Sequence, residues 1–428
     1  MVTRIRITYS AQRQGITSWI GIGTRPSEGQ GMDQQMLAGG PLGGLVSVQR
    51  GASSFGPTAQ YFRWGIARRH GHPSQGAWLG SLPLGPDRQA MKLISYRSPS
   101  GKDRVALWAA DQAWDAGSWN PQCGPDMKAF LEQGEAAMDA LRGLEQRVLQ
   151  GDAPIKPLSL EAKDWLAPVP KPASCRDGYA FRQHVASARR NRGVDMIPEF
   201  DHQPIFYFTN HQAIIGPGPV ICMPDHFRQL DFELEVAVVI GKAGRNVRAE
   251  EADRYIAGYT IMNDWSARTL QMEEMLLSLG PAKGKDFATA LGPYLVTPDE
   301  LEAWACPPKA GHTGGSLALD MVARLNGEEV SRGNMKDMDW TFAEIIERCA
   351  YGASIMPGDV IGSGTVGTGC FLELNGTGRR LDPEGFQPRW LVAGDVMELE
   401  ITGLGTLTNT VVADPDAFSI LALKKAAQ

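Results

Sequence analysis

One alternating stretch, residues 231–241 (DFELEVAVVIG), restricts the fold of this chain more than any other segment. Apolar side chains occupy every second position, and a period of two is typical of a β-strand. Glu233 and Glu235 therefore lie on the same face, with their backbone positions ~7 Å apart. This face continues into Ala237 and Val239 and so runs towards a core, where two unpaired carboxylates would be costly. A shared cation that prefers oxygen ligands, Mg²⁺, Ca²⁺ or Mn²⁺, would remove that cost. The alternative is an edge strand whose glutamates are solvated.

The composition is that of an ordinary globular enzyme. The 428 residues are 43% hydrophobic and 21% charged, and the formal net charge of −6 leads us to expect no nucleic-acid or membrane partner. The sequence contains neither a run of 18 apolar residues nor the pattern of a cleavable signal peptide. Its six cysteines are scattered without a CxxC motif, which is typical of reduced thiols. A cytoplasmic location is therefore expected.

Residues 1–90 differ in composition from the rest of the chain. They contain nine arginines and no lysine, and their short apolar pieces are interrupted by Gly and Pro without a sustained period. A segment of this kind cannot readily offset the entropy of ordering it. We interpret it as a disordered extension, translated from an over-long gene model; the alternative is a small Gly-rich domain. A chain that starts at Met91 is then expected to fold with an unchanged melting midpoint.

The rest of the chain is expected to form two domains. Residues 91–165 contain a strand followed by an amphipathic helix at 126–150, which indicates a small α+β domain. A Pro-rich linker at 154–172 separates it from residues 166–428, which are rich in short strands and Gly turns. Asn326-Gly327 between alternating runs predicts a β-hairpin, and 371–374 is interpreted as another strand.

Residues of three types, Asp, Glu and His, suggest a reaction centre in the second domain. Asp177 precedes His184 by seven residues, and the two glutamates of the opening stretch are followed by Asp264. Seven residues are about two turns of a helix, so Asp177 and His184 would face the same way if both were helical. A lone histidine on a helix is more often a satisfied polar residue than a catalyst, and each of these signals is weak alone.

Six short motifs between residues 170 and 413 make the set more specific. They are LDFELE (230–235), MNDWSAR (262–268), GKDF (284–287), PGDVI (357–361), SGT (363–365) and GDVME (394–398). Their sequence and order strongly resemble the fumarylacetoacetate hydrolase family. The resemblance implies a mostly β (α+β) fold, a mixed β-sandwich roll catalytic domain preceded by a small α+β N-terminal domain. It also implies a homodimer and a divalent metal, usually Mg²⁺ or Ca²⁺.

The resemblance assigns roles to individual residues. It implies that the metal ligands are Asp177, Glu233, Glu235 and Asp264. It implies that His184 is the base that takes a proton from water and that Glu373 orients it. Lys285 and Gln271 match positions that stabilise or protonate the leaving carbanion. Tyr179 and Thr365 match positions that contact the substrate, and Arg190 or Arg192 would hold its acid group.

The sequence also departs from the family pattern. Met275 stands where fumarylacetoacetases have a tyrosine, and the spacing from Asp264 to Lys285 is one residue longer. These differences leave the class of chemistry in place but leave the substrate open.

Three functions are compatible with these residues. The first is a metal-dependent hydrolase that cleaves a C–C bond in a small 1,3-dicarbonyl acid such as fumarylacetoacetate or an acylpyruvate. Two substrate oxygens would chelate the metal, a lysine would stabilise the carbanion and a histidine would activate water. The second keeps the metal site but is an isomerase or decarboxylase (a lyase) of 2-oxo acids. The third is a Ca²⁺-stabilised β domain that binds a partner and catalyses nothing.

Overall fold

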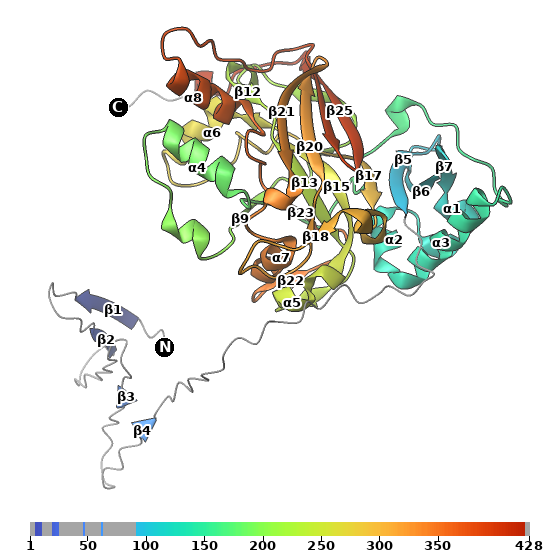
Figure 1. Cartoon of the computed structure of the whole chain (residues 1–428), viewed down its shortest axis with the longest axis horizontal. Coiled ribbons are helices and arrows are strands. Elements are labelled where there is room, and N and C mark those ends of the chain that lie inside the picture. The colour runs from blue at the N-terminus through green and yellow to red at the C-terminus, as the bar shows by residue number, and fades with distance from the viewer. Residues whose placement is uncertain (1–4, 11–18, 25–45, 48–60, 63–90, 424–428) are drawn as a thin grey trace. The chain divides into compact units, whose positions relative to one another are not determined.

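The computed structural model describes residues 5–10, 19–24, 46–47, 61–62 and 91–423 (Figure 1). The chain divides into two compact units, residues 1–83 and 84–428. In the first unit β1 (Ile5–Ser10) pairs antiparallel with β2 (Trp19–Thr24), and β3 (Val46–Ser47) pairs with β4 (Tyr61–Phe62). The expected disordered extension at 1–90 lies mostly outside the described residues and stays a prediction.

A ten-stranded mixed sheet runs through the second unit. In spatial order its strands are β7 (Gln112–Asp115), β6 (Asp103–Ala109), β5 (Lys92–Arg97), β17 (Thr289–Val296), β15 (Ile256–Asp264), β13 (Leu234–Ile240), β23 (Val360–Gly362), β8 (Cys175–Gly178) and β9 (Phe206–Thr209), with β10 (Ile214–Ile215) beside β17. Most of the predicted strand at 231–241 is β13, which pairs with β15 on one side and with β23 on the other, whereas Glu233 precedes it and Asp231 belongs to a separate short strand.

A second sheet has five strands. Its spatial order is β11 (Gly218–Cys222), β25 (Gly405–Ala413), β24 (Val396–Ile401), β20 (Asp320–Leu325) and β21 (Glu328–Asn334). The Asn326-Gly327 hairpin between β20 and β21 is confirmed, and both turn residues have positive φ, 53° and 82°. Three two-stranded pairs complete the strands: β12 (Leu230–Asp231) with β16 (Ser266–Ala267), β14 (Gly244–Arg245) with β22 (Ser354–Ile355), and β18 (Ala305–Cys306) with β19 (Ser316–Leu317).

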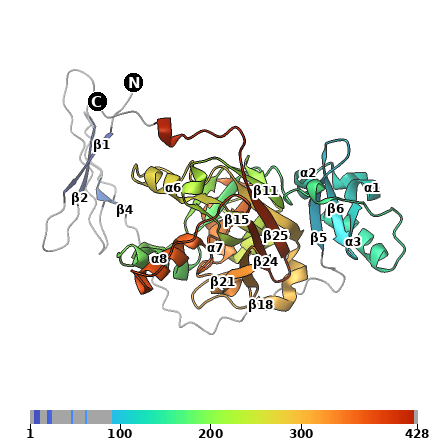
Figure 2. The same ribbon diagram turned by 90° about the horizontal axis from the view of Figure 1, so that it is seen from above.

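Most of the helices lie at the two ends of this unit, and α5 and α7 lie between them (Figures 1 and 2). They are α1 (Ala116–Trp119), α2 (Met127–Glu132), α3 (Glu135–Leu149), α4 (Arg182–Asn191), α5 (Ala249–Ala252), α6 (Arg268–Met275), α7 (Phe342–Ala350) and α8 (Phe371–Leu381). In both views α6 and α8 lie at the end opposite α1–α3 and β5–β7. None of the helices in the described residues is long and apolar enough to cross a membrane.

Two sequence-based assignments are wrong in detail. The helix expected at 126–150 is broken into α2 and α3, because Gly134 between them has φ +62°, outside the helical region. The strand expected at 371–374 is the first turn of helix α8. Four residues with two leucines and a phenylalanine fit either period, and so pattern alone could not separate strand from helix.

Strand β5 joins the predicted N-terminal domain to the main sheet. Leu93 and Lys92 of β5 pair with Leu295 and Val296 of β17, and residues 84–428 form one compact unit. The proposed division between 91–165 and 166–428 stays a prediction. The fold class itself, mostly β with α+β organisation, is confirmed.

Strand β13 separates two hydrophobic cores. Val236 and Val238 belong to a core that contains residues of both large sheets, whereas Ala237 and Val239 belong to a core that includes α2 and α3. The strand is thus buried on both faces. Glu235 alternates in step with Ala237 and Val239 along the strand. Its carboxylate therefore points to the same face as these residues, the face that packs against the core with α2 and α3.

Candidate functional site

Four carboxylates meet where neighbouring inner strands of the ten-stranded sheet end. Asp177, Glu233, Glu235 and Asp264 each place an oxygen within 4.8 Å of the others. Asp177 comes from β8, Glu235 from β13 and Asp264 from β15, while Glu233 directly precedes β13. All four are buried: Glu233 is 6% exposed and Glu235 is 0% exposed. The alternative of solvated glutamates on an edge strand is therefore wrong.

A glycine makes this meeting possible. Strand β23 lies between β13 and β8, and its residue at the level of the carboxylates is Gly362. A Cβ atom at Gly362 would lie 2.6 Å from Asp177 Oδ1 and 3.0 Å from Glu235 Oε2. Any side chain there would displace both carboxylates, since these separations are shorter than van der Waals contact. Gly362 thus supplies the space in which Asp177 and Glu235 approach each other across a strand.

Two cations are ion-paired with the cluster. Lys285 Nζ lies 2.5 Å from Glu233 Oε2 and 2.6 Å from Asp264 Oδ2. Arg268 contacts Glu233 Oε1 at 2.7 Å and Asp231 Oδ2 at 2.8 Å. Burial acts to raise the pKa of Glu233, but Lys285 and Arg268 together lower it to about 2. Glu233 is therefore ionised at neutral pH.

The two cations do not neutralise the cluster. The four carboxylates face Lys285 and Arg268, and Arg268 is shared with a fifth carboxylate, Asp231. Burial, together with the neighbouring Asp264, raises the pKa of Asp177 to about 7; burial and Asp177 raise that of Glu235 well above its usual value. The Oδ1 atom of Asp264 is buried without a hydrogen-bond partner among the described residues.

These features fit a hard divalent cation. The donors are all carboxylate oxygens, which suit Mg²⁺, Ca²⁺ or Mn²⁺. A dication among them would offset the charge that otherwise raises the pKa of Asp177 and Glu235.

A histidine and a glutamate form a second polar group. His184 Nδ1 lies 2.7 Å from Glu373 Oε2, and both side chains are buried. The same Glu373 oxygen accepts the backbone N–H of Thr368 at 3.0 Å. With Glu373 as acceptor, Nδ1 of His184 carries the proton and Nε2 is left as a base.

The route by which Asp177 and His184 come together differs from the expected one. Asp177 lies on β8, and His184 lies in the first turn of α4, so the two do not share a helix face. The chain turns at Gly178–Phe181 between strand and helix. Glu373 reaches His184 from α8, which packs against α4.

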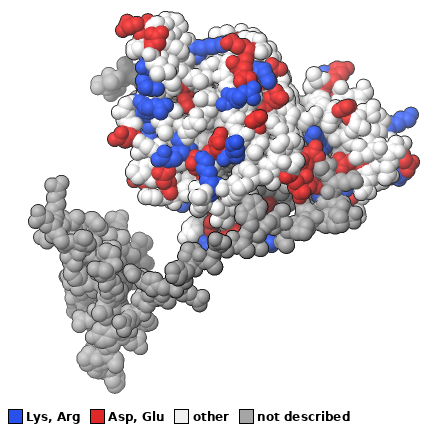
Figure 3. All heavy atoms as spheres, viewed as in Figure 1, with Lys and Arg blue, Asp and Glu red and all other residues white. Residues whose placement is uncertain are grey.

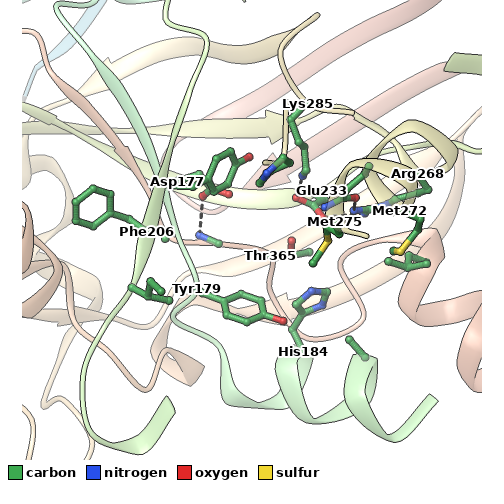
Figure 4. Close-up of a pocket in the computed structure, with 18 of the residues that line it drawn as sticks. Asp177, Tyr179, His184, Phe206, Glu233, Arg268, Met272, Met275, Lys285 and Thr365 are labelled. Carbon is green, nitrogen blue, oxygen red and sulfur yellow. Dashed lines mark hydrogen bonds and ion pairs between the residues drawn. The ribbon is translucent and has the colours of Figure 1, made fainter. Parts of the chain in front are cut away.

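Both groups border one pocket (Figure 4). The cavity has a volume of about 500 Å³ and lies among α4, α6, α8 and β9. The sequence-predicted residues that line it are Asp177, Tyr179, His184, Arg192, Glu233, Gln271, Lys285 and Thr365. Glu235, Asp264 and Glu373 lie behind this lining. Of the two candidate arginines, Arg192 lines the cavity, whereas Arg190 Nη2 donates to Ser187 Oγ at 3.1 Å.

Sequence reasoning missed three residues of the site. Tyr207 lines the pocket and its hydroxyl donates to Asp264 Oδ2; burial and Asp264 raise its pKa well above the usual value. Arg268 belongs to the MNDWSAR motif, but its residue type and spacing alone indicate no role. Gly362 stands directly before the SGT motif and carries no functional group that would indicate one. Tyr207 carried no usable signal, because its neighbours predict only a strand.

Fold and site together define a class: mostly β α+β proteins with a buried carboxylate cluster at the floor of a pocket. A family model described as Fumarylacetoacetate (FAA) hydrolase C-terminal matches residues 174–412, more than half of the chain. The chain belongs to the fumarylacetoacetate hydrolase family.

Several curated and solved proteins are similar to this chain. Oxaloacetate tautomerase FAHD2A, mitochondrial, from Homo sapiens is 31% identical over 345 residues, which cover 77% of this chain and 94% of that protein. Fumarylacetoacetase from Arabidopsis thaliana is 27% identical over 352 residues, or 68% of this chain and 83% of that one. The solved fumarylacetoacetate hydrolase from psychrophilic Exiguobacterium antarcticum is 26% identical, with a TM-score of 0.54, and covers 76% of this chain and 100% of that chain.

Proposed function

We propose that this protein is a divalent-metal-dependent hydrolase that cleaves a C–C bond in a 1,3-dicarbonyl acid of the fumarylacetoacetate or acylpyruvate kind. One observation carries the proposal: His184, oriented by Glu373, borders the same cavity as the carboxylate cluster. A base in this position can activate water beside a substrate carbonyl that lies over the cluster.

The roles of the side chains follow from their contacts. Asp177, Glu233, Glu235 and Asp264 would hold the cation, which when bound polarises the substrate oxygens as a Lewis acid. His184 Nε2 removes a proton from water, and Glu373 stabilises the imidazolium that results. The water oxygen adds to the carbonyl carbon, the C–C bond breaks, and its electron pair leaves as an enolate. His184 then returns the proton to this carbon, so that atoms and charge balance.

Lys285 suits charge stabilisation better than proton donation. Burial acts to lower the pKa of its ammonium, but Asp264 and Glu233 raise it above the usual value. A group that holds its proton so firmly stabilises a developing enolate without giving the proton up. Gln271, whose side-chain oxygen accepts from Arg268 at 3.0 Å, can direct its amide N–H groups into the cavity.

The test is to incubate the purified chain with Mg²⁺ or Mn²⁺ and a 2,4-dioxo acid in H₂¹⁸O. We expect equimolar pyruvate and carboxylic acid, with one ¹⁸O atom in the acid. Chelation of the metal should stop the reaction. If neither a 2,4-dioxo acid nor fumarylacetoacetate is cleaved under these conditions, the hydrolase proposal is wrong.

A second candidate function has a specific observation in its favour. Relatives about 31% identical over most of their length carry the name oxaloacetate tautomerase. The same base and cation beside a chelating site could move a proton at the carbon next to a 2-oxo group, or expel CO₂. Oxaloacetate incubated with the protein would then reach its enol–keto equilibrium faster, or release pyruvate and CO₂, without incorporation of ¹⁸O at a cleaved bond.

We further propose a small keto acid as the ligand, a homodimer as the assembly, and no nucleic-acid or membrane partner. On the face shown in Figure 3, acidic and basic side chains are interspersed among the described residues, without a continuous basic stripe. Light scattering of the purified chain would test the dimer. A cytoplasmic location remains a proposal, which fractionation of the source cells would test.

A further inference from the structure

One wall of the pocket is made of large apolar side chains that remain partly open to solvent. Met272 and Met275 project from α6 and are 38% and 50% exposed, and Leu372 of α8 also lines the cavity. Phe206 of β9 lies on the side of the cavity opposite the methionines (Figure 4), and the neighbouring Ile205, another lining residue, is 57% exposed. Figure 4 shows both methionines close to Arg268 and Glu233, so the apolar wall begins directly beside the charged floor.

The charges of the pocket are concentrated at the floor. Lys285 and Arg268 are both ion-paired with buried carboxylates. Among the residues that the structure describes, Arg192 has no ion-pair partner, and it lies exposed where α4 ends. The charged groups at the floor can therefore bind the carbonyl and carboxylate oxygens of a 2-oxo acid. The side chains of the methionine wall carry no group that could hydrogen-bond to a polar substituent.

Two small residues, Ala188 of α4 and Gly376 of α8, also line the cavity. A Cβ atom at Gly376 would lie 2.7 Å from Asn191 Nδ2, so α8 approaches α4 closely at this point. The cavity of about 500 Å³ lies within the range of about 300–1,000 Å³ that is typical of small-molecule sites. Oxaloacetate would fill only part of it.

We propose that the acyl group of the substrate, on the far side of the bond that breaks, is an extended apolar group, either an alkyl chain or an aryl ring. This inference rests on the proposed function and specifies its substrate class. Met272, Met275 and Leu372 contact the acyl group and select it. A bound apolar chain covers methionine surface that is otherwise in water, which is a favourable exchange, and flexible thioether side chains adapt to different shapes. A second carboxylate at this end would lose its hydration instead.

The first experiment varies the acyl group. kcat/KM is measured with Mn²⁺ for 2,4-dioxo acids whose acyl group grows from acetyl to hexanoyl, and for the hexanoyl compound that carries a terminal carboxylate. We expect roughly a threefold gain for each methylene, and about eightyfold over the four methylenes from acetyl to hexanoyl. The terminal carboxylate should cancel this gain. A best rate with the dicarboxylate, lost in Arg192→Met, would overturn the inference.

A matched pair of variants locates the effect. Met275→Lys places a cation in the wall, whereas Leu276→Lys makes the same change at the next residue, which is 84% exposed and outside the lining. We expect Met275→Lys to lower kcat/KM for the hexanoyl compound about tenfold and to raise it for the dicarboxylate. Leu276→Lys should leave both within about twofold. Equal effects of the two variants would contradict a role for this wall.

A binding experiment separates this inference from the proposed reaction. Simple 2-oxo acids from four to eight carbons cannot be cleaved as 1,3-dicarbonyls, and calorimetry in the presence of Mn²⁺ measures their affinity. Affinity that rises with chain length in the wild type but not in Met275→Lys supports the apolar subsite even if no 2,4-dioxo acid is hydrolysed. A flat series in the wild type refutes the subsite whatever reaction is catalysed.

Discussion

Two buried ionic clusters begin at neighbouring residues of β8, and they differ in charge balance. Arg176 contacts Asp359 at 3.3 Å, Ser174 donates to the same aspartate at 2.7 Å, and both charged side chains are buried. Here one cation meets one anion. Asp177, the next residue, points to the other face and joins the carboxylate cluster, where anions exceed cations. A balanced buried pair needs nothing more, whereas an unbalanced one indicates a missing positive ligand.

The largest effect is expected for Glu235→Gln, which removes a ligand but keeps the shape of the side chain. We expect loss of detectable Mn²⁺ binding by calorimetry and a fall in activity of about 10³-fold or more, since Lewis-acid catalysis supplies several kcal/mol. Without metal at pH 8, the variant should be no less stable than the wild type, because one repelling carboxylate is gone. Retained Mn²⁺ binding would show that the cluster is not the metal site.

His184→Ala is expected to lower kcat on a 2,4-dioxo acid by ~10²–10⁴-fold with metal affinity nearly unchanged. His312→Ala is the matched control, because His312 Nδ1 also contacts a glutamate, Glu344, at 3.0 Å but lies outside the pocket lining. Full activity of His184→Ala would instead favour the tautomerase or decarboxylase alternative.

Loss of the cation from the balanced Arg176–Asp359 pair should lower stability and leave metal binding unchanged. Arg176→Met leaves Asp359 buried without its cation, and we expect the free energy of unfolding to fall by about 3–5 kcal/mol, measured by urea denaturation. Mn²⁺ affinity should not change. A loss of metal binding without a loss of stability would reverse the comparison between the two clusters.

The unbalanced cluster should also make stability depend on pH and metal together. Without metal, the folded chain holds protons on Asp177, whose pKa is raised from 3.8 to about 7, and on Glu235. The unfolded chain has released these protons, so stability should fall as pH rises from about 4 to about 7. Mn²⁺ at 100 times its Kd should add about 2.7 kcal/mol at pH 8, and less at pH 5.5, where protons compete. An equal gain in melting temperature at both values would contradict this linkage.

The sequence predicted those parts of the fold that depend on local pattern. The alternation around Val236 identified β13, and Asn326-Gly327 identified the β20–β21 hairpin, because period and turn chemistry are written in adjacent residues. The carboxylate cluster itself was suggested by Glu233 and Glu235, since two anions on a strand face that continues into a core demand a partner.

Other features depend on contacts between distant segments and could not be predicted in this way. The seven-residue spacing would give Asp177 and His184 a common face only if both were helical, but the chain passes from strand β8 to helix α4 between them. Glu373 meets His184 across 189 positions of sequence, and Tyr207 meets Asp264 across 57. No local period specifies such pairs.

Gly362 gives the site an unusual genetic vulnerability. It has no functional group, and its contribution is the volume that its missing methyl group leaves to Asp177 and Glu235. A saturation screen of this chain should therefore score position 362 as intolerant as the carboxylates themselves, with alanine already harmful. Gene variants at such a position would be underestimated by any criterion that weighs only the chemical character of the residue replaced.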